Sequence, residues 1–250
     1  MTWVFDRVIL CFSRAPRGCP LAREGFPTDA GLSDSFDGPT HHSITDLAIL
    51  RSLPNMTVVV PADPLAVARL LPQVAAWDGP VYFRLCRNEV PQIFGDDYRP
   101  EIGQAITLIP GTDVTVICCG VLVSSAIEAA RVLAAEGLSV RGVEMHTVKP
   151  LDIAMVERCA SETGAIVTAE EHSVIGGLGG AVAGALVQTL PVPLERVGLA
   201  DTFAESGPYL DLLNKCGLSV AGVVGAVRRV LERRAALVCQ TPSNSWRGTA

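Results

Sequence analysis

A short turn followed by two histidines is the stretch of this sequence best equipped for chemistry. Asp37 opens the turn Asp37–Thr40, and His41 and His42 follow it directly. Aspartate accepts hydrogen bonds, glycine is flexible and proline fixes its φ angle, so this composition predicts a tight turn. An imidazole with an ordinary pKa of about 6.5 can exchange a proton near neutral pH. We therefore take Asp37 and His41 as candidate site residues; the alternative is a structural turn with ordinary loop histidines.

A third candidate lies further along the chain, at the end of a predicted strand. The segment Val81–Arg87 alternates in side-chain bulk, and Arg87 is its last residue. A guanidinium group presents a planar fork of donors that matches a phosphate. Ligands of open α/β sheets bind at the carboxyl ends of the strands. Arg87 is therefore a candidate anion-binding residue, and the alternative is an ordinary surface ion pair.

Packed elements on either side of the turn would hold these residues in place. A helix is expected to begin near Ser43, with Asp46 completing a loose capping box. The β-branched run Thr57–Val60 predicts a buried strand. A second helix is expected over Asp63–Trp77, capped by its first residue and with Pro64 at its first helical position. Functional residues often lie on such a loop between rigid elements.

From Pro110 onward the pattern changes to a plain alternation of strands and helices. Strands are expected at Val114–Cys119, Ser139–Met145, Ala165–Ala169 and near Val197, and helices at Ser124–Glu136, Leu151–Thr163, Gly179–Thr189 and Ser219–Arg234. Such alternation predicts an α/β domain with a mostly parallel sheet covered on both faces.

Composition excludes several classes of function. The formal net charge is −6 and the pI about 5.2, which disfavours nucleic-acid binding through phosphate neutralisation. No apolar run reaches the ~18 residues of a membrane span, and the first residues do not resemble a signal peptide. The eight cysteines include no CxxC pair. We expect reduced, buried cysteines in a cytoplasmic protein, the alternatives being a disulfide framework or a zinc site.

Three blocks of sequence resemble one family in its own order. DGPTHHS…LRSLPNMTVVVPADP, from Asp37 onward, resembles the pyrimidine-binding (Pyr) domain of transketolases, deoxyxylulose-phosphate synthase and the β subunits of 2-oxo-acid dehydrogenases. TVKPLD at Thr147–Asp152 and TAEEHSVIGGLGGAVAGAL at Thr168–Leu186 resemble the C-terminal domain of these proteins. The resemblance covers roughly Gly31 to Arg234.

The resemblance implies a division of the chain. Residues 1–27 would be a divergent N-terminal segment, because the first half of a normal Pyr domain is not found there. Residues 28–95 would be a truncated, thiamine-diphosphate-binding Pyr domain, 96–112 a linker, 113–235 the transketolase C-terminal-like α/β domain and 236–250 a tail.

The same resemblance gives roles to the candidate residues. It implies that Asp37 and His41 contact hydroxyls of a sugar at the mouth of the thiamine channel, and that Arg87 holds the sugar's phosphate. Two departures stand against it. The family's catalytic glutamate is not matched, since Glu24 has an unrelated context, and Asp29 replaces a substrate-binding histidine. An anion at that position would repel a sugar phosphate.

The cofactor implied is thiamine diphosphate with Mg²⁺, which supplies the reactive carbanion. The family binds the diphosphate and metal in a separate domain, whose Gly-Asp-Gly…Asn motif is not found here. The chain would thus be the C-terminal subunit of a split transketolase, transferring a two-carbon ketol unit between sugar phosphates. It would need an N-terminal-type partner subunit in a homo- or hetero-oligomer. Alternatives are a deoxyxylulose-phosphate-synthase-like or 2-oxo-acid dehydrogenase β-like subunit, and a truncated, catalytically silent scaffold.

Two further polar clusters allow a functional or a structural interpretation. Gly176–Gly180 follows a strand and opens a helix, which suggests a phosphate cradle, but its spacing is not GxGxxG, so we interpret it as close packing. Glu170–His172 look like an acid–base cluster. Because the family's C-terminal domain carries no known chemistry, we interpret them, with His146 and Lys149, as structural or interfacial.

Overall fold

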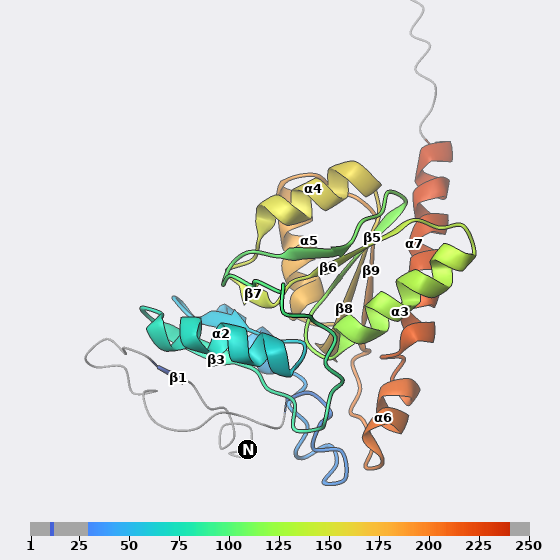
Figure 1. Cartoon of the computed structure of the whole chain (residues 1–250). Coiled ribbons are helices and arrows are strands. Elements are labelled where there is room, and N and C mark those ends of the chain that lie inside the picture. The colour runs from blue at the N-terminus through green and yellow to red at the C-terminus, as the bar shows by residue number, and fades with distance from the viewer. Residues whose placement is uncertain (1–10, 13–29, 241–250) are drawn as a thin grey trace, which may run out of the picture.

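The computed structural model describes residues 11–12 and 30–240 (Figure 1). Expectations about Glu24, Asp29, the division at residue 27 and the last ten residues fall outside this part of the chain. Before residue 30, the structure describes only β1 (Cys11–Phe12).

A four-stranded sheet, in the order β1-β3-β2-β7, carries the first half of the chain. Its strands β2 (Thr57–Val59) and β3 (Pro80–Phe83) run parallel, and β1 pairs antiparallel with β3. Helices α1 (Asp46–Ser52) and α2 (Pro64–Ala76) pack against it through two separate apolar clusters.

The start of α2 forms as the sequence predicts. Asp63 is its N-cap, and the Asp63 carboxylate accepts the Ala66 N–H at 2.7 Å. Its second oxygen accepts the N–H groups of Ile93 and Phe94 at 2.8 and 3.0 Å. One capping side chain therefore also fixes the chain that follows β3.

A five-stranded sheet, in the order β4-β6-β5-β8-β9, carries the second half. Strands β5 (Val114–Cys118), β6 (Val140–Glu144), β8 (Ile166–Ser173) and β9 (Leu194–Leu199) are parallel neighbours, whereas β4 (Ile106–Ile109) is antiparallel to β6. Helices α3 (Leu122–Ala135) and α7 (Val220–Gln240) cover one face, and α4 (Ile153–Thr163) and α5 (Leu178–Gln188) the other (Figure 1). The mostly parallel sheet covered on both faces is confirmed.

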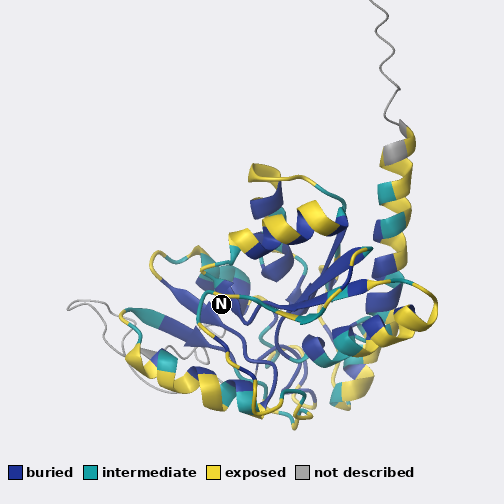
Figure 2. Cartoon of the chain, turned by 45° about the horizontal axis from the view of Figure 1, so that its top comes forward, coloured by how far each residue is buried: buried dark blue, intermediate teal, exposed yellow. Residues whose placement is uncertain are grey.

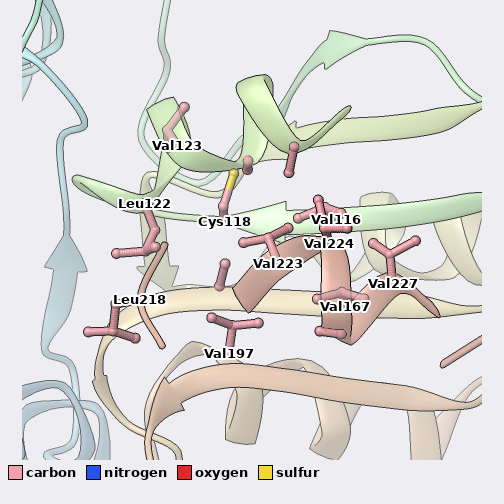
Figure 3. Packing of buried hydrophobic residues seen from close by; sticks show 14 of the residues in the cluster. Val116, Cys118, Leu122, Val123, Val167, Val197, Leu218, Val223, Val224 and Val227 are labelled. Atoms are coloured by element: carbon pink, nitrogen blue, oxygen red, sulfur yellow. The ribbon is translucent and has the colours of Figure 1, made fainter. Parts of the chain in front are cut away.

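Burial on both faces explains the apolar strands. Figure 2 shows the strands buried between helices whose outer faces are exposed. On the α3/α7 side, Val116, Val167 and Val197 from three neighbouring strands meet Val223 and Val227 of α7 (Figure 3). Parallel strands enclosed in this way have near-continuous hydrophobic sequences.

The two sheets share a core, and one strand from the second half of the chain completes the first sheet. Leu47 and Val58 of the first half lie in the same buried cluster as Ile117 and Leu178 of the second. Strand β7 (Thr147–Lys149) follows β6 in the chain but pairs antiparallel with β2. The halves are thus packed directly on each other, which brings β8 close to the loop before α1.

Two local expectations are wrong. Helix α1 begins at Asp46, and its N-cap Thr45 makes no side-chain capping bond, because Asp46 is buried in an ion pair instead. Strand β3 ends at Phe83, so Arg87 lies on the loop that follows it.

One helical stretch, Tyr209–Leu237, is long and apolar enough by composition to cross a membrane. It combines α6 (Tyr209–Lys215) with most of α7. Its residues Leu212, Leu218, Val223 and Val230 are buried in the core beside the five-stranded sheet. Packing of this kind accounts for its hydropathy, since core helices of folded domains have the same composition.

Candidate functional site

Residues 31–43 form a loop that is closed at its neck; we call it the histidine loop. Gly31 N–H donates to the Ser43 carbonyl at 3.0 Å, and Ser43 N–H donates back to the Gly31 carbonyl at 2.9 Å. The loop therefore leaves and rejoins the fold at one point. Compact loops of this kind commonly carry functional residues.

Asp37 and His41 lie on the outer part of the histidine loop. Asp37 is exposed and His41 is partly buried. The His41 N–H donates to the Gly38 carbonyl at 2.9 Å, and its Nδ1 lies 2.9 Å from Thr40 Oγ1. Gly38 has φ +77°, and a Cβ there would lie 2.2 Å from Ser206 Oγ. The turn thus needs glycine for its backbone conformation and its close approach to the 201–208 loop.

Arg87 is brought to the same loop through an ion pair. Its Nη1 lies 2.7 Å from Asp34 Oδ1, and its side chain is 53% exposed whereas that of Asp34 is 6% exposed. The next residue, Asn88, donates from Nδ2 to the Ser33 carbonyl at 2.7 Å. The guanidinium is therefore anchored to the histidine loop while about half of its side chain faces solvent.

His42 is partly buried in the histidine loop. Burial lowers the pKa of His42, an effect that Asp34 opposes and His41 reinforces. Both ring nitrogens of His42 are buried without a hydrogen-bond partner within residues 30–240. A neutral imidazole offers one donor and one acceptor, but neither ring nitrogen of His42 is exposed to a hydroxyl from solvent in this structure.

A buried ion pair lies next to the end of the histidine loop. Arg84 Nε lies 2.6 Å from Asp46 Oδ2, and Tyr82 Oη donates to the same oxygen at 2.6 Å. Burial alone would raise the pKa of Asp46, but the charge and hydrogen bond of Arg84, together with His172 and the Tyr82 hydroxyl, outweigh burial and lower that pKa. The sequence alone does not indicate a role for Arg84. Its pairing with Asp46 becomes visible only in the fold, where Arg84 is buried four residues after the first residue of β3.

The glycine-rich start of α5 already holds an anion of the chain itself. The Glu170 carboxylate accepts the N–H groups of Leu178 and Gly179 at 2.6 and 2.8 Å. A Cβ on Gly177 would lie 2.1 Å from Glu170 Oε2. The packing interpretation of Gly176–Gly180 is confirmed, and Glu170 has a structural role.

The candidate residues lie on an open surface. Two hollows of about 550 and 780 Å³ lie beside α2 and beside β4, and none of Asp37, His41 or Arg87 lines either one.

Comparison with known proteins decides the family. The pyrimidine-binding domain model of transketolase matches residues 23–92, and the transketolase C-terminal domain model matches residues 103–223. The chain belongs to the transketolase family. This confirms the resemblance found in the sequence.

Among curated transketolase relatives, one of the most similar is a 6-deoxy-6-sulfo-D-fructose transketolase subunit, SqwH, of Clostridium sp. (strain MSTE9). It is 42% identical over 207 residues, which are 83% of this chain and 64% of the relative. A subunit of the apulose-4-phosphate transketolase of Phocaeicola vulgatus is 37% identical over 194 residues, 77% of this chain and 62% of the relative.

A solved split-gene transketolase, described as an inactive β4 tetramer, has the same fold. Its TM-score is 0.74 at 43% identity, over 82% of this chain and 64% of the other. The chain thus spans less than two thirds of the length of these relatives. A 1-deoxy-D-xylulose-5-phosphate synthase of Geobacter sulfurreducens is 37% identical, but the chain covers only 34% of it.

The transketolase cofactor fits this chain only in part. Across residues 11–12 and 30–240, no group of three or more His, Cys, Asp or Glu side chains could hold a metal ion. The helix start that might receive a diphosphate is filled by Glu170. The described residues therefore do not fit the diphosphate and Mg²⁺.

Proposed function

We propose that this chain is the C-terminal subunit of a split, thiamine-diphosphate-dependent transketolase that transfers a two-carbon ketol unit between sugar phosphates. The observation that carries the proposal is the junction of the histidine loop with Arg87 through Asp34, 2.7 Å apart. It places imidazoles and a phosphate-matching fork on one surface.

In this proposal the chain binds and orients the sugar. Arg87 holds the phosphate through the exposed part of its guanidinium. His41 hydrogen-bonds a hydroxyl of the sugar chain, and the exposed carboxylate of Asp37 accepts a hydrogen bond from another hydroxyl. Fixing both ends of a flexible substrate in this way lowers the entropy cost of reaching the reactive geometry.

Thiamine diphosphate, when bound, supplies the nucleophilic carbon that accepts the two-carbon unit. We assign its diphosphate and Mg²⁺ to an N-terminal-type partner subunit, because the described residues do not fit them. The solved relative's name includes a tetramer of β subunits, which supports an oligomeric assembly for this chain as well.

We also propose a cytoplasmic location. Within residues 30–240, six cysteines are free thiols, and three of them, Cys118, Cys119 and Cys159, are buried. Free thiols of this kind are typical of a reducing compartment.

A catalytically silent scaffold is the second candidate, and one observation favours it. Between residues 30 and 92 the only glutamate is Glu89, which is exposed on a loop beyond β3. It therefore does not fit the role of the family's glutamate beside the cofactor ring.

Reconstitution tests the proposal. The chain is co-expressed with an N-terminal-type transketolase subunit, and transfer of a two-carbon unit from a ketose phosphate to an aldose phosphate is measured. We expect activity only when both chains are present. Condensation of pyruvate instead would indicate a deoxyxylulose-phosphate-synthase-like enzyme, and a stable complex without any turnover would support the scaffold.

A further inference from the structure

We infer that Glu171, a residue of the C-terminal domain, is a positioning residue that fixes the histidine loop of the Pyr domain together with Arg84. This deepens the proposed function, on which it rests for what the loop binds. It gives the C-terminal domain a part in the substrate site although none of its residues needs to touch the sugar.

The carboxylate of Glu171 holds the beginning of the loop. Its Oε1 accepts the N–H of Leu32 at 2.7 Å and the hydroxyl of Tyr209 at 3.0 Å. Gly31 has φ +64°, and a Cβ there would lie 2.3 Å from Glu171 Cδ. The carboxylate thus lies directly against the loop backbone, and the chain accommodates it only because residue 31 has no side chain.

The end of the loop is held from the same strand. Arg84 Nη2 donates to the Ser43 carbonyl at 3.0 Å and to the main-chain carbonyl of Glu171 at 3.1 Å. Two residues further along β8, the Ser173 N–H donates to the Ile44 carbonyl at 2.9 Å. One guanidinium therefore joins the loop's exit to the residue that binds its entry.

Arg84 can do this because its own orientation is fixed. Its Nε and Nη2 face the two oxygens of Asp46 at 2.6 and 3.2 Å, a two-point contact that only a planar fork makes. Asp46 is the first residue of α1, which follows the loop directly. Arg84 therefore ties the loop's exit, the helix after it and β8 together.

Burying a carboxylate is costly unless it makes specific bonds. Glu171 is 3% exposed, and burial raises its pKa to about 7 although Arg84 and the Leu32 N–H oppose that rise. An apolar residue at this position would leave the Leu32 N–H buried without an acceptor. The fold thus keeps a buried carboxylate, which costs free energy, at the position where its hydrogen bonds hold the histidine loop.

The neighbouring Glu170 provides a matched control. It is equally buried on the same strand, but its carboxylate caps α5 and does not contact the loop. Loss of either carboxylate removes two hydrogen bonds from the fold, and only one of the two removals reaches the loop.

The test compares Glu171→Leu, Glu171→Gln and Glu170→Leu in the full chain with its partner subunit. Amide hydrogen exchange by mass spectrometry reports on peptides spanning 30–44 and 177–182, and steady-state kinetics reports on the sugar phosphate. We expect E171L to speed exchange in 30–44 about tenfold. We also expect it to raise KM about tenfold with kcat within about twofold. E171Q keeps an acceptor and should restore both, and E170L should speed exchange only in 177–182.

Unchanged exchange in 30–44 for E171L, or an equal increase for E170L, would overturn the inference. If E171L does not fold, Tyr209→Phe removes one donor to the same oxygen and should speed loop exchange about threefold; no increase would again overturn it. A wild-type complex without ketol transfer would refute the proposed function separately, because the exchange result does not depend on turnover.

Discussion

The guanidinium of Arg87 lies 2.7 Å from the carboxylate of Asp34, across 53 residues of sequence. This pair is where the loop after β3 meets the histidine loop. Because the Arg87 side chain is 53% exposed, the pair contributes little to stability, under ~1 kcal/mol. The pair instead orients Arg87, because it fixes one edge of the guanidinium group while about half of the side chain faces solvent.

Replacing Arg87 should therefore impair binding more than folding. We expect Arg87→Ala to raise KM for the phosphorylated sugar about 10- to 100-fold in the reconstituted enzyme, and to change the free energy of unfolding by less than ~1 kcal/mol. Arg131→Ala is the control, because Arg131 is an exposed arginine on α3 that pairs with Glu128. An equal rise in KM for both variants would contradict the phosphate role.

His42 should remain neutral at pH values where an ordinary histidine begins to titrate. Burial lowers its pKa below 6.5, with Asp34 opposing and His41 assisting. An NMR titration of the ring protons is expected to give a midpoint below 6.5 for His42. Since the folded state resists protonation, His42 should make the protein less stable as the pH falls through 6.5. A titration midpoint at or above pH 6.5 would contradict the prediction that burial lowers the pKa of His42.

The buried pair of Arg84 and Asp46 should matter far more than a surface pair of the same length. Asp46→Asn leaves a buried guanidinium without its counter-charge, and we expect a loss of roughly 3–5 kcal/mol in the free energy of unfolding. The control is Lys215→Ala, which breaks an exposed pair with Glu205 that is also 2.6 Å long. That change should cost less than ~1 kcal/mol. Similar losses in denaturant titrations would show that burial is not the deciding factor.

Glu144 should make stability depend on pH. It is fully buried, and burial raises its pKa to about 8, a rise that the Tyr98 hydroxyl bond opposes and Asp63 reinforces. Above pH 4.5 the unfolded state has released a proton that the folded state keeps, so stability should fall as the pH rises from about 5 to about 8. The linked free energy has an upper bound of roughly 5 kcal/mol.

Glu144→Gln keeps the size of the side chain and removes its titration. Its unfolding free energy should fall less steeply than that of the wild type between pH 5 and 8. The remaining slope comes from Glu171, whose pKa burial raises to about 7, and from Glu170, whose pKa burial also raises. Parallel curves for the two proteins would contradict the assignment.

The sequence predicted those parts of the fold that depend on local pattern. The strands of the five-stranded sheet could be predicted because burial on both faces produces apolar runs, and α2 because Asp63 and Pro64 mark its start. It did not predict β7, whose three residues pair with β2 almost ninety residues earlier, or α6, which has only seven residues. Short elements of this kind depend on tertiary contacts rather than on their own propensity.

The candidate site shows the same limit. Asp37, His41 and Arg87 could be proposed from residue type and resemblance, and their roles remain predictions. Asp34, Arg84 and Glu171 could not, because each acts through a partner between 38 and 139 residues away. Asp46 was expected to serve as a capping residue, but Arg84 offers it a stronger partner from inside the fold. Long-range pairing of charged residues leaves no local sequence pattern from which the pairs could be predicted.

The central claim is that this chain supplies sugar-binding residues beside a cofactor held by another subunit. Titration calorimetry of thiamine diphosphate and Mg²⁺ tests it most directly, with this chain alone and with the reconstituted complex as the two samples. We predict negligible binding to the chain alone and saturable binding to the complex. Micromolar binding to the chain alone would contradict the account.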